Sequence, residues 1–456
     1  MMTDTVDYSD IGPVYRKHSP RPPGVYYETS VVPGPGPVFR TGVPVFVGFI
    51  ERLNFGEWND SRVFNLDRWA QFHYLFIPLR DGYLVHAVRG FFANGGEHCV
   101  VLPIPGDKNH STEMANALLE IFAGGGALDN LEDIDLVCVP DAMPGVNEKK
   151  MDHAEARRIQ AAVLEHCYRM GDRFAILDGY QQETTAGAQG EIETTGMQDA
   201  VLHWQSLPRE YGAYGALYYP WISVREAYYA TDSESLGTTD MPCKKHSESM
   251  AMEIPGFRNF PVNRSVPPCG HIAGIYSRSD ARVGVHKAPA NELLEEAVKL
   301  TIDYGNRELA VMNEAGVNCL RSACGRGIRV WGARTLSGQP DQSYVNVRRL
   351  FLTLTRWLRR NMEDLAFETN DQRLWERIRQ RITGYCRHLF DQGALKGSSP
   401  AQAFFVKCDA ETNPPEKQEA GEVIAEVGLA PATPLEFIVV RITQRASTLS
   451  VTGLNV

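Results

Sequence analysis

The sequence predicts an α/β fold, α+β overall, in which an open, partly parallel sheet is followed by two basic amphipathic helices. Two observations predict it. Between residues 62 and 224, short apolar runs alternate with segments of helical periodicity, which is typical of β-α-β units. Residues 348–388 hold ten arginines, no lysine and five acidic residues, in a chain whose formal net charge is -10.

The composition is that of a globular protein. The 456 residues are 43% hydrophobic and 22% charged, enough for two or three domains. No apolar run reaches the roughly 18 residues that a membrane span requires, and the polar, acidic N-terminus is unlike a signal peptide. Nine cysteines without a CxxC pair favour neither a disulfide framework nor a zinc site. We therefore expect a protein made in the cytoplasm, without metal or cofactor.

The N-terminal segment is expected to be extended. Prolines interrupt residues 1–24 too often for a helix. Val25, Tyr26 and Tyr27 then begin a β-branched and aromatic run that predicts a strand, and a second strand is predicted over residues 43–51.

The following segment alternates strands and helices. Strands are predicted where apolar residues run together, and helices where they recur every three or four positions. The predicted strands cover residues 69–76, 98–104, 133–140, 173–179 and 215–224, and the predicted helices cover residues 83–96, 114–126 and 153–170. The polar, proline-bounded loop 231–268 ends this α/β region. After it, a helix over residues 292–304 is predicted with Asn291 as its N-cap, and strands over residues 317–323 and 327–336.

Three aspartates, Asp135, Asp141 and Asp178, lie near the carboxyl ends of predicted strands, where α/β enzymes keep catalytic groups. Turn residues and helix caps are the more common role of aspartates at such positions. The sequence has no GxSxG or HExxH motif and no glycine-rich phosphate loop after a strand. An α/β hydrolase or transferase is therefore the alternative interpretation.

Two basic helices are predicted over residues 344–367 and 370–390, the second with Asn370 as its N-cap. The predicted apolar stripes are Val347, Leu350, Phe351, Leu354 and Leu358 in the first helix, and Leu374, Ile378, Ile382, Tyr385 and Leu389 in the second. The arginines expected on the opposite, outward sides are Arg349, Arg356 and Arg360, then Arg373, Arg377 and Arg381. The use of arginine without any lysine in these helices favours a partner with an acidic surface. Such charge runs are, however, more often ordinary solvated helix faces.

The last predicted strand is PLEFIVVRITQ, residues 434–444, and its part PLEFIVVRI is apolar on both faces. An unpaired strand of this kind favours aggregation, so we expect it to lie between subunits.

Several motifs occur in an order that resembles contractile tail sheath proteins of phage tails and phage-tail-like injection systems. They are PPGVYYE, GALYYPWISV, PCGHIAGIYSRSDARVGVHKAPANE, WGARTL, YVNVRRL, FETND, GALKGSSPAQAFFVKCD, ETNPP and APATPLEFIVVRITQ. The resemblance implies a structural subunit that polymerises in stacked hexameric rings around an inner tube and contracts to drive the tube through a target envelope. It implies no catalysis, and it implies partners among copies of itself, the tube, the baseplate and the terminator or cap proteins.

The resemblance also implies how the chain is divided. The expected parts are an N-terminal arm (1–30), an outer α/β domain (31–268), an inner sheath domain (269–432) and a C-terminal arm (433–456). Strands lent by neighbouring subunits would complete the inner sheet. The predicted tube-contact residues are Arg348, Arg349, Arg356, Arg359, Arg360, Arg373, Arg377 and Arg381, and the predicted inter-subunit strand residues are Val25, Tyr26, Tyr27, Leu435, Phe437, Ile438, Val439, Val440 and Ile442.

Two other classes make different predictions. An α/β enzyme would have a deep pocket with perturbed acids. A nucleic-acid-binding module would bind DNA or RNA with a steep salt dependence, which the acidity of the whole chain opposes. Direct binding of nucleic acid is therefore not expected.

Overall fold

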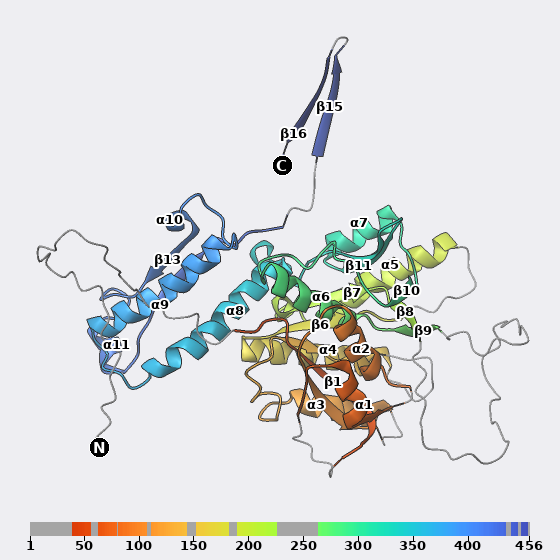
Figure 1. Ribbon diagram of the computed structural model, residues 1–456, viewed down its shortest axis with the longest axis horizontal. Helices are drawn as coiled ribbons and strands as arrows, with labels where there is room; N and C mark the ends of the chain where they lie inside the picture. Colours follow the sequence, from red (N-terminus) through yellow and green to blue (C-terminus); the bar gives the residue numbers. More distant parts are fainter. Residues whose placement is uncertain are drawn as a thin grey trace, which may run out of the picture. The chain divides into compact units, whose positions relative to one another are not determined.

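A computed structural model describes residues 39–55, 63–79, 81–106, 111–143, 152–181, 189–225, 263–434, 439–445 and 448–454. The elements below all belong to one unit, Arg40–Val456 (Figure 1). The expected arm over residues 1–30, with Val25, Tyr26 and Tyr27, lies outside the described residues, as do Leu435, Phe437, Ile438 and most of the loop 231–268.

The main sheet has nine of the described strands. In spatial order they are β12 (Gly327–Trp331), β11 (Asn318–Ala323), β7 (Gly215–Tyr219), β6 (Phe174–Asp178), β5 (Leu136–Cys138), β1 (Pro44–Leu53), β4 (Cys99–Pro105) and β2 (Phe64–Leu66), with β3 (Phe76–Pro78) paired to β1. The strands from β11 to β4 run parallel, whereas β12, β2 and β3 are antiparallel to their neighbours. This mixed, largely parallel sheet confirms the predicted fold class.

Helices cover both faces of the sheet, because right-handed crossovers place helices on opposite faces when the strand order reverses. The helices of this region are α1 (Trp69–Leu75), α2 (Leu84–Ala93), α3 (Ser111–Phe122), α4 (His153–Met170), α5 (Gln189–Ser206), α6 (Cys269–Arg282) and α7 (Asn306–Ala315). The crossover α2 leads from β1 to β4, while α3, α4 and α5 lead in the other direction, from β4 to β5, β6 and β7. Accordingly α2 packs on α6, and α3 packs on α4. With both faces covered, β1 is a continuous buried run from Pro44 to Ile50.

Two predicted elements were wrong. Residues 69–76 form helix α1 and then β3, because Trp69, Phe72 and Phe76 recur at helical spacing and pack together. The helix predicted over residues 292–304 is instead an extended segment that ends in β10 (Ala297–Leu300).

Backbone pairing explains the second error. The amides of Asn291 and Leu294 donate to the carbonyls of Val330 and Ile328 on β12, at 2.7 and 2.9 Å. Asn291 has a φ of 57°, outside the range of a helix N-cap. Tertiary pairing has overridden the helix propensity of this segment. The strand β10 belongs to a separate sheet in the order β10, β8 (Ile222–Arg225) and β9 (Asn263–Val266).

The sheet continues past the boundary expected at residue 268. Helix α6 contacts β5 and β6, and β11 pairs with β7, so residues on both sides of this position share one core. That core extends to Leu336 and takes in Val345 and Leu352.

The C-terminal elements build a second, smaller core. They are α8 (Val345–Met362), α9 (Gln372–Asp391), α10 (Pro400–Ala403), β13 (Phe404–Lys407), α11 (Pro415–Glu419) and β14 (Glu426–Leu429), and the core residues are Leu350, Leu389, Ala394, Leu395 and Ala403. The N-cap of α9 is Asp371, whose carboxylate accepts the amides of Arg373 and Leu374. The prediction of Asn370 was wrong by one position, because its side chain instead accepts a hydrogen bond from Trp375.

The described chain ends in a hairpin. Strand β15 (Val439–Arg445) pairs antiparallel with β16 (Thr448–Leu454), so Val439, Val440 and Ile442 lie in a strand, as predicted. No helix within the described ranges is both long enough and apolar enough to cross a bilayer.

Candidate functional site

Helix α8 is buried on two sides. Its apolar residues Val345 and Leu352 join the core of the main sheet, while Leu350 joins the smaller C-terminal core. On the C-terminal side, Trp357 stacks on Tyr385 of α9 with ring centroids 4.2 Å apart. Helix α8 therefore connects the two cores.

Arg349 is at the centre of a buried ion triad. Its guanidinium donates to both carboxylate oxygens of Asp280, at 2.9 and 2.5 Å, and to Asp135 at 3.1 Å. It is 2% exposed and lies over the ring of Tyr276. Asp135 also accepts the backbone amides of Gly42 and Val43, at 2.9 and 2.6 Å. The triad thus joins α8, α6 and the start of β1.

Burial and pairing act against each other in the triad. Burial raises the pKa of Asp280 above its usual range, and Arg349 offsets only part of that rise. Burial also opposes the charge of Arg349, but the carboxylates of Asp280 and Asp135 hold the pKa of this guanidinium above its usual range. Arg349 pairs with both buried carboxylates, so removing any one of the three groups would leave a buried charge without one of its partners.

The remaining arginines of α8 also bind groups of this chain. Arg356 is 6% exposed and donates to the carbonyl of Arg40 at 3.3 Å. Arg359 donates to Asp172 and to the carbonyl of Met170, both at 2.8 Å. Arg360 pairs with Asp133 at 3.1 Å. The guanidinium of Arg348 lies 4.1 Å from the ring centroid of Tyr214.

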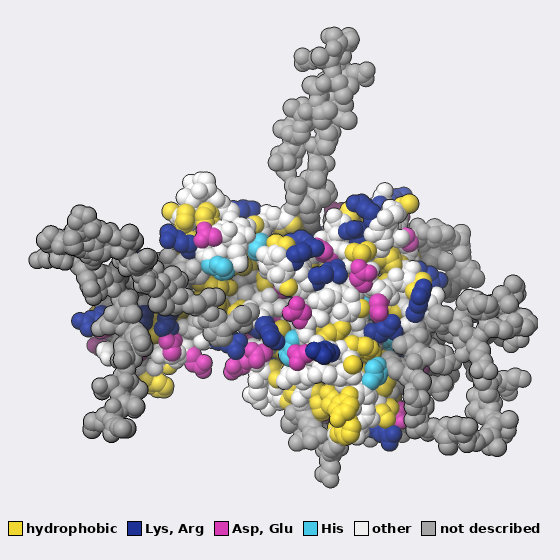
Figure 2. Space-filling model, viewed as in Figure 1, with side chains coloured by type: hydrophobic (Ala, Val, Ile, Leu, Met, Phe, Trp, Pro, Cys, Tyr) yellow, Lys and Arg dark blue, Asp and Glu magenta, His cyan; other side chains and the backbone are white. Residues whose placement is uncertain are grey.

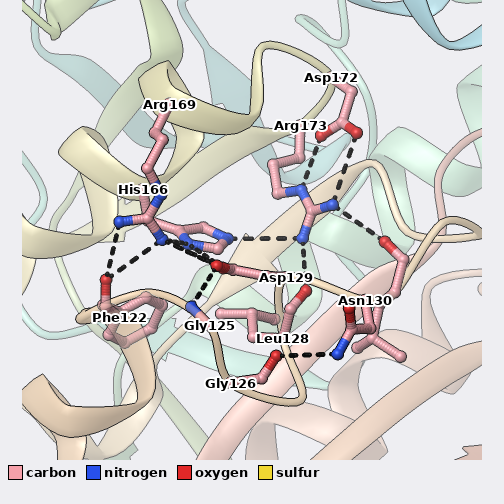
Figure 3. A network of polar contacts seen from close by, with 11 residues as sticks. Phe122, Gly125, Gly126, Leu128, Asp129, Asn130, His166, Arg169, Asp172 and Arg173 are labelled. Atoms are coloured by element: carbon pink, nitrogen blue, oxygen red, sulfur yellow. Dashed lines mark hydrogen bonds and ion pairs between the residues drawn. The ribbon is translucent and has the colours of Figure 1, made fainter.

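Arg359 reaches a second polar network through Asp172 (Figure 3). There Arg173, which is 1% exposed, binds Asp172 at 2.7 Å and the carbonyls of Leu128 and Leu131 at 2.9 Å each. Between Arg173 and the ion pair of Arg169 with Asp129 lies His166. Burial, and to a lesser extent the charge of Arg173, lowers the pKa of His166 to about 4. The imidazole is therefore neutral at neutral pH. The network fastens the loop between α3 and β5 to the end of α4.

The structure corrects the expected direction of two arginines. Arg349 and Arg356 lie opposite the apolar stripe of α8, as predicted, but that side is buried against the sheet region. Neither side chain is available to a partner in this conformation. Arg359 and Arg360 are 56% and 51% exposed, yet both are paired with aspartates of the same chain.

The arginines of α9 do face outward. Arg373 and Arg377 are exposed, and Arg381 is partly exposed. Arg377 pairs with Glu368 at 2.6 Å, and Arg381 binds both oxygens of Asp364 at 2.6 and 2.7 Å. On the face seen in Figure 2, basic side chains are interspersed with acidic ones.

The strand-end aspartates support the backbone. Asp141 lies where the strand order reverses, between β1 and β5, the usual ligand site of such sheets. Its carboxylate accepts the amides of Phe49 and Tyr83, at 2.7 and 2.5 Å. Asp178 accepts the amide of Cys269 at the start of α6, at 2.7 Å. These carboxylates hold helix and strand ends together, and the arrangement does not support the enzyme alternative.

Burial raises the pKa of Asp178 to about 7, well above the usual aspartate value of 3.8. The folded state therefore keeps a proton that the unfolded chain releases, so this group's contribution to stability falls as the pH rises from about 4 to about 7. Asp178→Asn keeps an acceptor for the Cys269 amide without the charge. We expect its melting temperature, relative to the wild type, to rise between pH 5 and pH 8. A difference that does not change with pH would contradict this assignment.

The comparisons with known proteins all lead to one family. The model of the phage tail sheath protein central domain matches residues 125–336, and that of the phage tail sheath C-terminal domain matches residues 337–445. The tail sheath protein of Enterobacteria phage T4 is 26% identical over 301 residues, which are 64% of this chain and 40% of that protein. The chain spans only about a quarter to two fifths of the length of the curated relatives it matches.

Solved structures extend the likeness to nearly the whole chain. A chain of the anti-feeding prophage baseplate is 26% identical with a TM-score of 0.65, covering 94% of this chain and 100% of that one. A chain of the sheath complex of the extracellular contractile injection system PVC, in its contracted state, is 26% identical with a TM-score of 0.66, covering 94% and 99%. Together the two matched domains span residues 125–445, and the chain belongs to the phage tail sheath family.

Proposed function

We propose that this chain is the repeating subunit of a contractile sheath, which polymerises around an inner tube and shortens to drive that tube through a target envelope. The observation that carries the proposal is the match of both tail sheath domains along one chain, together with the likeness to a contracted sheath complex over 94% of its length. Partners would be copies of itself, the tube, the baseplate and the terminator or cap proteins. Assembly would take place in the cytoplasm, before the particle is released or anchored to an envelope.

Strands exchanged between neighbours would hold the sheath together. Strands β13 and β14 form a sheet of two strands, and no further strand among the described residues pairs with either. Two strands alone are marginally stable and leave backbone groups open at both edges. An extended segment from another subunit could pair there through backbone hydrogen bonds. The candidates are the predicted N-terminal strand at Val25–Tyr27 and the C-terminal run that includes β15.

The inner tube would be contacted by the exposed arginines of α9. Burial removes Arg349 and Arg356 from the predicted contacts. Arg359 and Arg360 pair with Asp172 and Asp133 of the sheet region, whereas Arg377 and Arg381 pair with residues just before α9. Arg373, Arg377 and Arg381 remain on the outward side of α9, with Arg348 as a further candidate on α8. Contacts that must release on contraction are best made of several weak charge pairs, because exposed ion pairs contribute only about 0–1 kcal/mol each.

Reversing Arg373, Arg377 and Arg381 to glutamate is expected to prevent assembly on the co-expressed tube and to leave the helix content unchanged. Electron microscopy of the purified assemblies measures the first result, and circular dichroism measures the second. The matched control reverses Arg157 and Arg158, two exposed arginines of α4. Normal sheaths from the α9 variant would contradict tube contact through this helix.

A further inference from the structure

The hairpin of β11 and β12 carries a concentrated positive charge. Residues 318–334 contain Arg321, Arg326, Arg329 and Arg334 and no acidic residue. Arg329 is held by a hydrogen bond to the carbonyl of Asn291 at 2.6 Å, whereas Arg326 stands exposed at the turn. We call Arg321, Arg326 and Trp331 the hairpin surface.

The hairpin surface has the composition of a protein–protein interface. Trp331 is an edge-strand residue with 42% of its surface exposed, and the guanidinium of Arg321 lies 5.3 Å from its ring centroid. Next to this hairpin, the carboxylate of Asp303 accepts the backbone amide of Ser322 at 3.4 Å. Tryptophan and arginine are the residues most often found at the centre of protein interfaces, and arginine pairs with carboxylates in a bidentate geometry.

A surface of opposite charge lies elsewhere on the same chain. Residues 409–426 contain one lysine, Lys417, and six acidic residues, all exposed. We call these six the acidic surface: Asp409, Glu411, Glu416, Glu419, Glu422 and Glu426. Lys417 pairs with Glu422, and Lys407 pairs with Glu411. Glu416 and Glu419, on α11, have no ion pair within the described part of the chain.

The two surfaces do not neutralise each other within one subunit. Among the described residues, no ion pair joins Arg321 or Arg326 to the acidic surface, whose ion pairs are made with Lys407 and Lys417. A contact that uses two different surfaces of identical subunits is heterologous, and repeating it produces an open helical array or a ring. This is the symmetry that a sheath built from copies of one chain requires.

We propose that the hairpin surface of one subunit docks on the acidic surface of a second copy. This contact rests on the self-assembly proposed above and is separate from the strand exchange and from the arginines of α9. The contact would determine how neighbouring subunits align. Opposite charges attract when the two surfaces face each other, and like charges repel when subunits are misaligned.

A charge exchange tests the proposal. The basic variant is Arg321→Glu with Arg326→Glu, and the acidic variant is Glu416→Lys with Glu419→Lys. Each alone should lower the yield of sheaths on the co-expressed tube about tenfold or more, because like charges then face each other at the contact. The variant that carries all four changes should regain most of the yield. Arg158→Glu, at an exposed position of α4, is the matched control and should assemble normally.

The outcomes separate this proposal from the general function. If the wild type forms sheaths and both charge variants do so equally well, the contact is wrong and the sheath function stands. If the basic variant fails and the acidic variant assembles normally, the hairpin surface binds another partner and the proposal is overturned. If both fail without rescue, pairing between these two surfaces is overturned. Melting temperatures, together with the milder pair Arg321→Gln and Arg326→Gln, exclude misfolding as the cause.

Discussion

Replacing Arg349 with alanine is expected to lower the free energy of unfolding of the subunit by about 3–5 kcal/mol, the cost of removing one partner from a buried ion pair. The substitution leaves Asp280 and Asp135 facing each other at 8% and 5% exposure without their cation. Asp135 could not simply turn away, because it also accepts the amides of Gly42 and Val43. Urea denaturation of the purified subunit measures the effect.

Two variants show whether the buried charge is the cause. Arg360→Ala removes an ion pair that is 51% and 72% exposed, so its cost should stay within about 1 kcal/mol. Arg349→Met combined with Asp280→Asn removes two charges together and should recover part of the stability lost in Arg349→Ala. A subunit with Arg349→Ala that is as stable as the Arg360 variant would mean that the triad does not anchor α8.

This expectation changes what a charge reversal on α8 can test. Arg349→Glu would bring three carboxylates together in the core, so failure to assemble would report on folding and not on a partner. The arginines of α9 and of the hairpin surface are exposed or partly exposed, so reversals there keep the two effects apart.

The arginines of α8 mark the limit of what periodicity can predict. The pattern placed Arg349 opposite the apolar stripe, and the structure agrees. Whether that side faces solvent depends on Asp280 and Asp135, which are 69 and 214 residues away in sequence. Nothing local to α8 distinguishes an arginine that meets water from one that meets a distant carboxylate.

The parallel strands could be predicted for a physical reason. A strand buried on both faces is a continuous apolar run, and the predicted strands at residues 43–51, 98–104, 133–140 and 173–179 contain or overlap β1, β4, β5 and β6. The errors came from segments whose conformation depends on pairing elsewhere. Residues 292–304 have the composition of a helix but pair with β12 at their start and with β8 through β10. The aromatic residues from 69 to 76 favour a strand but pack at helical spacing.

Truncation after Pro434 is expected to abolish polymerisation and to leave a folded subunit. Among the residues whose burial the structure describes, those of both cores lie between Val43 and Leu429, ahead of the truncation. The terminal run can contribute backbone hydrogen bonds to a neighbouring sheet. Residues 434–442 are apolar on both faces and lead into β15, which suits a strand held between subunits. The melting temperature should stay within a few degrees of the wild type, while electron microscopy should find no tubes.

Point variants make the same test without a deletion. Val440→Pro removes one backbone donor from the strand and should reduce assembly strongly, whereas Val440→Thr keeps the donor and the β-branched shape and should assemble. Deleting residues 1–24 tests the N-terminal arm in the same way. Long sheaths formed by the truncated chain on its co-expressed tube would show that this end lends no strand. The open edges of β13 and β14 would then have to be completed by the N-terminal segment alone, because the sheet has only two strands of its own among the described residues.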